Sequence, residues 1–223
     1  DNVKSAAENF SHQVSQAFGK KRKKSKNLAI DKIMLDGFKS LESRDFKIEN
    51  GERIMEHARS IKSAEEIKAM RCSISACETS IHVMEKETKP GMTENDIWSI
   101  LHSENIKRGG EWIETRLLSS GTKTNPWFQE CGSRILQKNE IVAFDTDLVG
   151  CYSMCTDISR TWWIGDQEPT KEMKQDYQIA LEHIQKNAEL VAPGVHFKDL
   201  TFKGHQLDDM YKKQQYSCRF HGV

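Results

Sequence analysis

The chain has 223 residues, of which 37% are hydrophobic and 30% charged, and its 33 lysine and arginine residues balance 33 aspartate and glutamate residues. This composition is typical of a folded, soluble protein and excludes a disordered, collagen-like or membrane-spanning chain. Because the formal net charge is zero, no overall field attracts nucleic acid or an anionic membrane, and we expect neither as a partner.

The cysteines and the start of the chain indicate a compartment. Six cysteines in this length are too sparse for a disulfide scaffold, and none of them forms a Cys-x-x-Cys pair. No stretch of apolar residues is long enough to span a bilayer, and the first residues lack the order of a secretory signal. We therefore expect free thiols and a cytoplasmic protein.

Signals are weak over residues 1–60. A polar segment with a faint helical pattern is followed by a basic run, residues 20–26, which we interpret as a solvated linker because no aromatic residues interleave it. Apolar residues between Ile30 and Leu41 predict a helix, and Asn50-Gly51 predicts a turn before an extended stretch that ends at Ser60. We assign residues 1–60 to the end of an N-terminal domain and a linker.

The pattern sharpens after Ser63, which begins a capping box with Glu66. Apolar residues then recur at alternating spacings of three and four and predict a long helix that ends before Pro90-Gly91. Thr93-x-x-Asp96 predicts the cap of a second helix, and residues 112–119 predict a strand.

A similar order recurs about a hundred residues later. A helix predicted from Thr170 stops at Pro193-Gly194, and apolar residues predict a further helix after it. Pro-Gly is ordinary punctuation after one helix, but two matching copies favour an internal duplication in which two helix pairs cover a shared sheet.

Residues 141–164 lie between these copies and predict a β-hairpin that turns near Gly150. Alternation along a strand puts Asp145 and Asp147 on one face, where Asp157 of the return strand can meet them. Converging carboxylates repel one another unless cations lie between them, so we expect a site for divalent metal ions. The alternative is that these are solvated carboxylates near a turn. His221 is the candidate imidazole ligand, which favours a transition metal.

These residues resemble the pita-bread superfamily of methionine aminopeptidases, prolidases and creatinases. The resemblance rests on Asp-Ile-Ser-Arg-Thr at 157–161 and Phe-His-Gly at 220–222 and covers about residues 60–223. It implies an α+β pita-bread fold, with duplicated helix-helix-sheet units around a curved antiparallel sheet, and a partial catalytic domain over residues 61–223. Two glutamate ligands of the superfamily would follow Val223, so we expect a domain truncated at its C-terminus.

Two departures from the peptidase pattern distinguish this chain. Thr146 lies between Asp145 and Asp147 where the superfamily has its first metal-binding aspartate, and no histidine occurs between His102 and His183, where the peptidases carry one that contacts the scissile peptide. Both departures, and long runs over residues 108–116, 125–132 and 144–163, are similar to dimethylsulfoniopropionate lyases of the DddP type.

This second resemblance implies a homodimeric enzyme with two divalent metal ions, iron or another transition metal, that cleaves a small-molecule substrate, dimethylsulfoniopropionate, by β-elimination. It implies the metal ligands Asp145, Asp147, Asp157 and His221, and an active-site tyrosine at Tyr216. The catalytic aspartate of those lyases would follow the histidine. A metallopeptidase acting on Xaa-Pro bonds and a non-catalytic pita-bread module are the alternatives.

Overall fold

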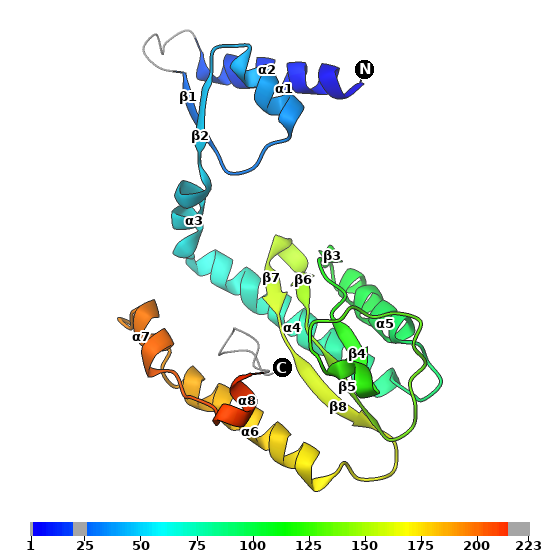
Figure 1. The fold of residues 1–223 in the computed structure, drawn as a ribbon. Coiled ribbons are helices and arrows are strands. Elements are labelled where there is room, and N and C mark those ends of the chain that lie inside the picture. The colour runs from blue at the N-terminus through cyan, green and yellow to red at the C-terminus, as the bar shows by residue number, and fades with distance from the viewer. Residues whose placement is uncertain (1, 20–25, 214–223) are drawn as a thin grey trace. The chain divides into compact units, whose positions relative to one another are not determined.

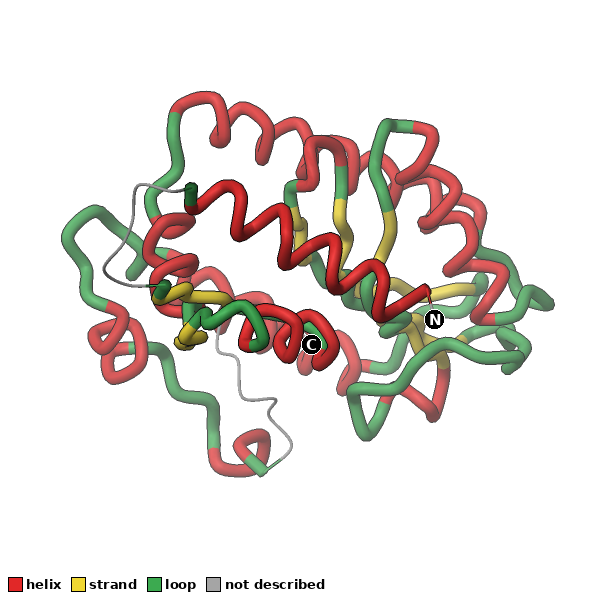
Figure 2. The backbone as a smooth tube through the Cα atoms, turned by 90° about the horizontal axis from the view of Figure 1, so that it is seen from above, coloured by secondary structure: helices red, strands yellow, loops and turns green. Residues whose placement is uncertain are grey.

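The computed structural model describes residues 2–19 and 26–213. They fall into two compact units, residues 1–65 and residues 66–223. Figure 2 shows that helix is the main structure and that the strands are short. Among the described residues, no helix combines the length and the apolar composition that crossing a bilayer requires.

The first unit contains helices α1 (Asn2–Phe18), α2 (Leu35–Glu42) and α3 (Glu52–Ser60) and a parallel pair of strands, β1 (Asn27–Ile30) and β2 (Lys47–Asn50). Its small core includes Leu41 and Phe46, and the Phe18 ring packs edge-on against Phe46. The assignment of residues 1–60 to an N-terminal domain and linker stays a prediction.

Two sequence predictions in this unit are wrong. The segment from Ile30 is not helical at its start, because residues 27–30 pair with β2 and the helix begins only at Leu35. Residues 52–60 form helix α3 and not an extended stretch. None of the α3 residues is buried, so the helix leaves no apolar periodicity in the sequence, and its glutamate, arginine, methionine and alanine residues supply helix propensity alone.

The second unit is built on two three-stranded antiparallel sheets that continue into each other (Figure 1). Three chain segments each cross from one sheet to the other, and together they form one bent ribbon. The segments are β3 (Trp112–Ile113) with β4 (Leu118–Ser120), β5 (Glu140–Phe144) with β6 (Asp147–Val149), and β7 (Cys155–Asp157) with β8 (Arg160–Ile164).

Helices α4 (Ala64–Glu87) and α5 (Glu94–Lys107) pack against this sheet. Their inward faces meet the strands in one core, which includes Met84, Leu101 and Phe144. The predicted capping box of α5 is present, with the Thr93 side chain accepting from Asp96 N and the Asp96 side chain accepting from Thr93 N. The hydrogen bonds also lower the pKa of the exposed Asp96 carboxyl.

The second helix pair is also present, as α6 (Lys171–Ala188) and α7 (Phe197–Lys203), with a short helix α8 (Asp209–Lys212) after it. No described residue of α6 or α7 belongs to the core cluster that α4 and α5 share with the sheet. The α6 helix buries His183 and Asn187 instead, and Asn187 accepts a hydrogen bond from His205 N at 2.7 Å.

Candidate metal centre

The predicted hairpin carries Asp147 and Asp157 to directly opposite positions. Asp147 begins β6, Asp157 ends β7, and the two are paired in the antiparallel ladder. Directly opposite side chains project from the same face of a sheet with their Cβ atoms about 4.5–5.5 Å apart. Two carboxylates in this arrangement repel each other, so a cation between them would be stabilising.

Asp145 lies at the junction between β5 and β6. Its backbone N donates to Leu117 O at 2.9 Å, and its side chain is almost completely buried, with 9% exposed. The Asp145 Oδ1 atom accepts hydrogen bonds from Ser159 Oγ at 2.8 Å and from Thr146 N at 3.1 Å. These donors hold the carboxylate in one orientation.

The strand segments on the two sides of the β5–β6 junction pair with it in different registers. On the return strand, Phe144 pairs with Arg160 and Asp147 with Asp157, so residues 145–146 face residues 158–159 with no residue left over. On the other side, residues 114–117 span the same gap as residues 145–147, which leaves one extra residue, as in a β-bulge. Bulges of this kind are common beside active sites, where they redirect a side chain. Here Thr115 Oγ1, within the bulge, donates to Asp147 Oδ2 at 2.9 Å.

The described residues do not by themselves complete a metal site. Within residues 2–19 and 26–213, no group of three or more His, Cys, Asp or Glu side chains is placed to hold a metal ion. The structure brings Asp147 and Asp157 together and places Asp145 beside them in the ribbon. Tyr216 and His221 lie outside the described residues. The four-ligand set therefore stays a prediction.

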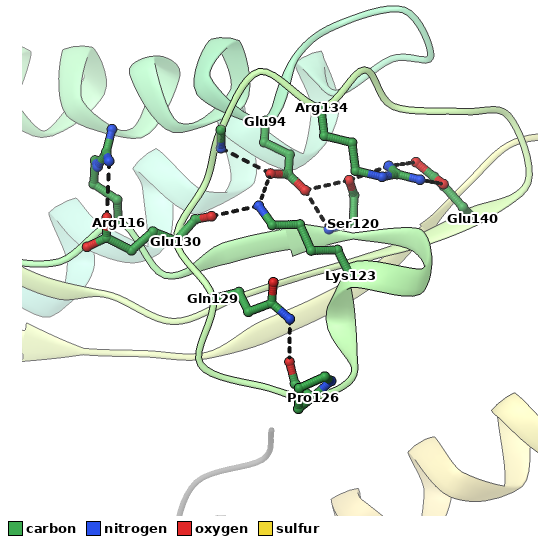
Figure 3. Close-up of polar contacts among 10 residues, drawn as sticks. Glu94, Arg116, Ser120, Lys123, Pro126, Gln129, Glu130, Arg134 and Glu140 are labelled. Carbon is green, nitrogen blue, oxygen red and sulfur yellow. Dashed lines mark hydrogen bonds and ion pairs between the residues drawn. The ribbon is translucent and has the colours of Figure 1, made fainter.

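A buried glutamate that the sequence analysis did not single out organises the loop after β4 (Figure 3). Glu94, in the first turn of α5, has no exposed surface, and its carboxylate accepts from both the backbone N and Oγ of Ser120. It also accepts from Lys123 Nζ at 2.6 Å and from Gly132 N at 3.0 Å. One side chain therefore fixes both ends of the loop over residues 121–132. The sequence signal was only an acidic residue after a helix cap, which is usually exposed.

An arginine extends this network to β5. Arg134 donates to Ser120 Oγ at 2.6 Å and binds both carboxylate oxygens of Glu140 at 2.7 Å. Partial burial alone would raise the pKa of Glu140, but the hydrogen bonds from Arg134 and from Gln137 N outweigh it and lower the pKa below its usual range. The same loop therefore has two charged anchors, Glu94 and Arg134.

Two tryptophans of β8, Trp162 and Trp163, have structural partners. The Trp162 ring packs edge-on against Phe144 with ring centroids 5.6 Å apart, and Trp163 Nε1 donates to Gln167 O at 2.7 Å. Both tryptophans also line a hollow of about 250 Å³ that Met173 and Tyr177 of α6 complete.

Comparison with solved structures identifies the fold. An X-Pro aminopeptidase from Thermotoga maritima superposes with a TM-score of 0.71 and 22% sequence identity, over 86% of this chain and 54% of that one. The prolidase from Pyrococcus furiosus superposes with a TM-score of 0.68 and 19% identity, over 78% of this chain and 52% of that one. The predicted α+β pita-bread fold is confirmed.

Comparison with known sequences gives closer relatives. The chain is 50% identical over 228 aligned residues to the dimethylsulfoniopropionate lyases DddP of Roseovarius nubinhibens and of Roseobacter denitrificans. The alignments cover 100% of this chain and 51% of each lyase, so the chain spans about half the length of these relatives. An uncharacterized peptidase of Staphylococcus aureus is 30% identical over 145 residues, 64% of this chain and 40% of that one. The family model of metallopeptidase family M24 matches residues 68–223, and the chain belongs to that family.

Proposed function

We propose that this chain forms part of a metal-dependent carbon-sulfur lyase that cleaves dimethylsulfoniopropionate to dimethyl sulfide and acrylate. The observation that carries the proposal is the 50% identity to two dimethylsulfoniopropionate lyases along the whole chain. We further propose that the enzyme is a cytoplasmic homodimer, as the resemblance to such lyases implies.

The proposed metal ligands are Asp145, Asp147, Asp157 and His221, which would hold two divalent ions, iron or another transition metal. The donor set suits such ions, because it combines carboxylates with one imidazole. The contacts of the described residues support a fit. Asp147 and Asp157 are opposed like charges, and Ser159 and Thr115 orient the carboxylates of Asp145 and Asp147.

The proposed reaction is a β-elimination. A base removes the proton on the carbon next to the substrate carboxylate, that electron pair forms the carbon-carbon double bond, and the carbon-sulfur bond breaks to release dimethyl sulfide. Bound divalent ions would act as Lewis acids that stabilise the charge developing on the substrate carboxylate. In this proposal the ribbon residues fix the ligand geometry, and Tyr216 orients the substrate.

Peptide hydrolysis is the competing activity within the family. The absence of a histidine between His102 and His183 argues against it, because that reaction needs a group that handles the proton of the scissile peptide. In the structure, the segment that follows Ser120 is a 3₁₀ turn, η1 (Gly121–Thr124), from which Lys123 reaches back to Glu94. This arrangement supports a structural role for the segment.

The test uses the full-length protein, supplied with Fe²⁺, Mn²⁺ or Zn²⁺ in separate samples. Dimethyl sulfide released from dimethylsulfoniopropionate is measured by gas chromatography, beside hydrolysis of Xaa-Pro dipeptides. We expect dimethyl sulfide and no peptide products, and we expect the variant Asp157→Asn to release none. Asp166→Asn is the matched control, because Asp166 is exposed and its ion pair with Lys138, among the described residues, is exposed as well. Peptide products without dimethyl sulfide would refute the lyase, and a protein without bound metal would favour the non-catalytic module.

A further inference from the structure

Two cysteines from distant parts of the second unit bring their sulfur atoms together. Cys72 lies on α4, and Cys151 begins the 3₁₀ helix η2 (Cys151–Ser153) at the tip of the hairpin. Their Sγ atoms are 3.4 Å apart, and both residues are free thiols. A disulfide bond has an S–S distance of about 2.05 Å, so the two sulfur atoms lie about 1.4 Å beyond bonding distance.

The surrounding contacts keep this pair in place. Ser73, next to Cys72, donates to Met154 O at 2.8 Å and shares a hydrogen bond of 2.9 Å with Thr156 Oγ1. On the hairpin, Gly150 precedes Cys151, and a Cβ atom there would lie only 2.1 Å from Ser73 Oγ. The helix and the hairpin tip therefore approach as closely as a glycine allows, with the two thiols beside the contact.

The two thiols differ in their access to solvent. Cys72 is exposed, whereas Cys151 has 8% of its surface exposed. Burial, followed by the hydrogen bond with Cys72, raises the pKa of the Cys151 thiol. An accessible thiol beside a second, buried thiol is the arrangement in which the first meets an oxidant and the second resolves the product.

We propose that Cys72 and Cys151 form a redox modification site, at which a peroxide produces an intramolecular disulfide. In the first step, the Cys72 sulfur attacks one oxygen of hydrogen peroxide, the O–O bond breaks, and the products are a Cys72 sulfenic acid and water. In the second step, the Cys151 sulfur attacks the Cys72 sulfur, the S–O bond breaks, and the hydroxide leaves as a second water with the thiol proton. Two thiols are oxidised and one peroxide is reduced.

The disulfide would join α4 to the hairpin whose strands carry Asp147 and Asp157. Neither cysteine is one of the proposed metal ligands, so the site is separate from the proposed reaction. The inference rests on the sulfur-sulfur contact and does not depend on the proposed function.

The test exposes the reduced, chelator-treated protein to hydrogen peroxide, blocks the remaining thiols, and maps tryptic peptides without reduction. We expect a cross-link between residues 72–86 and residues 139–160, and its loss after treatment with dithiothreitol. Each peptide holds a second cysteine, Cys77 or Cys155, so variants assign the bond. Cys77 has no exposed surface, which makes it a poor competitor of Cys72 for peroxide.

We expect the cross-link in the wild type and in Cys155→Ser, and its absence in Cys72→Ser and in Cys151→Ser. Cys72→Ser changes an exposed residue, so its far-UV circular dichroism should match the wild type and its result stays interpretable even where Cys151→Ser unfolds. A cross-link that persists in Cys72→Ser, or wild-type peptides that carry separate sulfinic acids and no cross-link, would overturn the proposal.

Discussion

Asp147 and Asp157 lie directly opposite each other in the ladder between β6 and β7. Without a cation, two like charges in such positions destabilise a sheet by on the order of 0.2–1 kcal/mol. In the proposed metal site both carboxylates are ligands, so a bound divalent ion should reverse the sign of this effect. The stability of this hairpin should therefore report whether metal is bound.

The substitution Asp157→Asn should separate these two effects. In metal-free protein we expect the variant to be slightly more stable than the wild type, since one of the opposed charges is removed. With Mn²⁺ or Fe²⁺ we expect the order to reverse, because the wild type alone gains binding energy. Thermal unfolding with and without metal measures both. Asp166→Asn should behave like the wild type in both conditions, and a metal-induced shift retained by Asp157→Asn would contradict the proposed ligand.

Ser159 and Thr115 should tune metal affinity without being ligands. Ser159→Ala removes the side-chain donor to Asp145 Oδ1 and leaves the donor Thr146 N, and Thr115→Val removes the Thr115 hydroxyl that donates to Asp147 Oδ2. Loss of a group that orients a ligand commonly weakens metal binding by about 10–100-fold. Titration calorimetry on each variant measures the change. Unchanged affinity in both variants would mean that these carboxylates are not ligands.

Glu94 should be a large stability determinant. Its replacement by alanine leaves Ser120 N, Gly132 N and the Lys123 ammonium without their shared acceptor. Removal of one partner from a buried ion pair costs about 3–5 kcal/mol, and we expect a loss of that size in urea unfolding. Glu130→Ala is the matched control, because its ion pair with Arg116 is exposed and should contribute about 0–1 kcal/mol. Equal effects of the two substitutions would refute the special role of Glu94.

Low pH should weaken the ion pair between Arg134 and Glu140. Because the folded protein lowers the pKa of Glu140 below the ordinary value of 4.5, the unfolded chain binds a proton more readily than the folded one. The stabilisation that ionised Glu140 gives the folded protein is therefore present above pH 4.5. It is lost as the pH falls through the lower pKa that Glu140 has in the folded protein. In urea unfolding as a function of pH, Glu140→Gln should have a shallower acid decline than the wild type. Parallel declines would contradict this assignment.

The contact of Gly150 with Ser73 should be intolerant of a side chain. An added Cβ atom would lie 2.1 Å from Ser73 Oγ and 3.1 Å from Ser73 Cβ, so Gly150→Ala should push α4 away from the hairpin tip. Overpacking of this kind costs about 1–3 kcal/mol. Gly132→Ala is a suitable control, since only the end of the Lys123 side chain lies within reach, at 3.9 Å. A double-mutant cycle with Ser73→Ala would measure the coupling, and additive effects would contradict it.

The sequence predicted those parts of the fold whose signals are local. The Thr93 cap and the hairpin around Gly150 each depend on a few neighbouring residues, and both are confirmed. Helix α3 was missed because it buries nothing and so has no periodicity to read. The bulge at residues 114–117 was missed because it exists only in the pairing of two strands, which no single strand encodes.

The same difference between local signals and contacts with distant residues applies to the candidate site. Alternation along the hairpin predicted which aspartates belong together, and the structure pairs Asp147 with Asp157. The residues next to Glu94 in the sequence did not predict its burial, because its partners are distant. Ser120, Lys123 and Gly132, which donate to its carboxylate, are 26 to 38 residues away in the chain. A residue whose partners come from a distant loop cannot be recognised from its own surroundings in the sequence.

The two halves of the hairpin pair with no unmatched residue between Phe144–Arg160 and Asp147–Asp157. This pairing limits where relatives of this chain can differ in length. One residue inserted between Phe144 and Asp147 would move Asp147 out of line with Asp157 and turn it to the other side of the strand. Residues added between Val149 and Cys155 would lengthen the turn and leave the aspartate pair aligned. An insertion that keeps the aspartate pair aligned must therefore fall between Val149 and Cys155, and it must also preserve the close contact of Gly150 with Ser73.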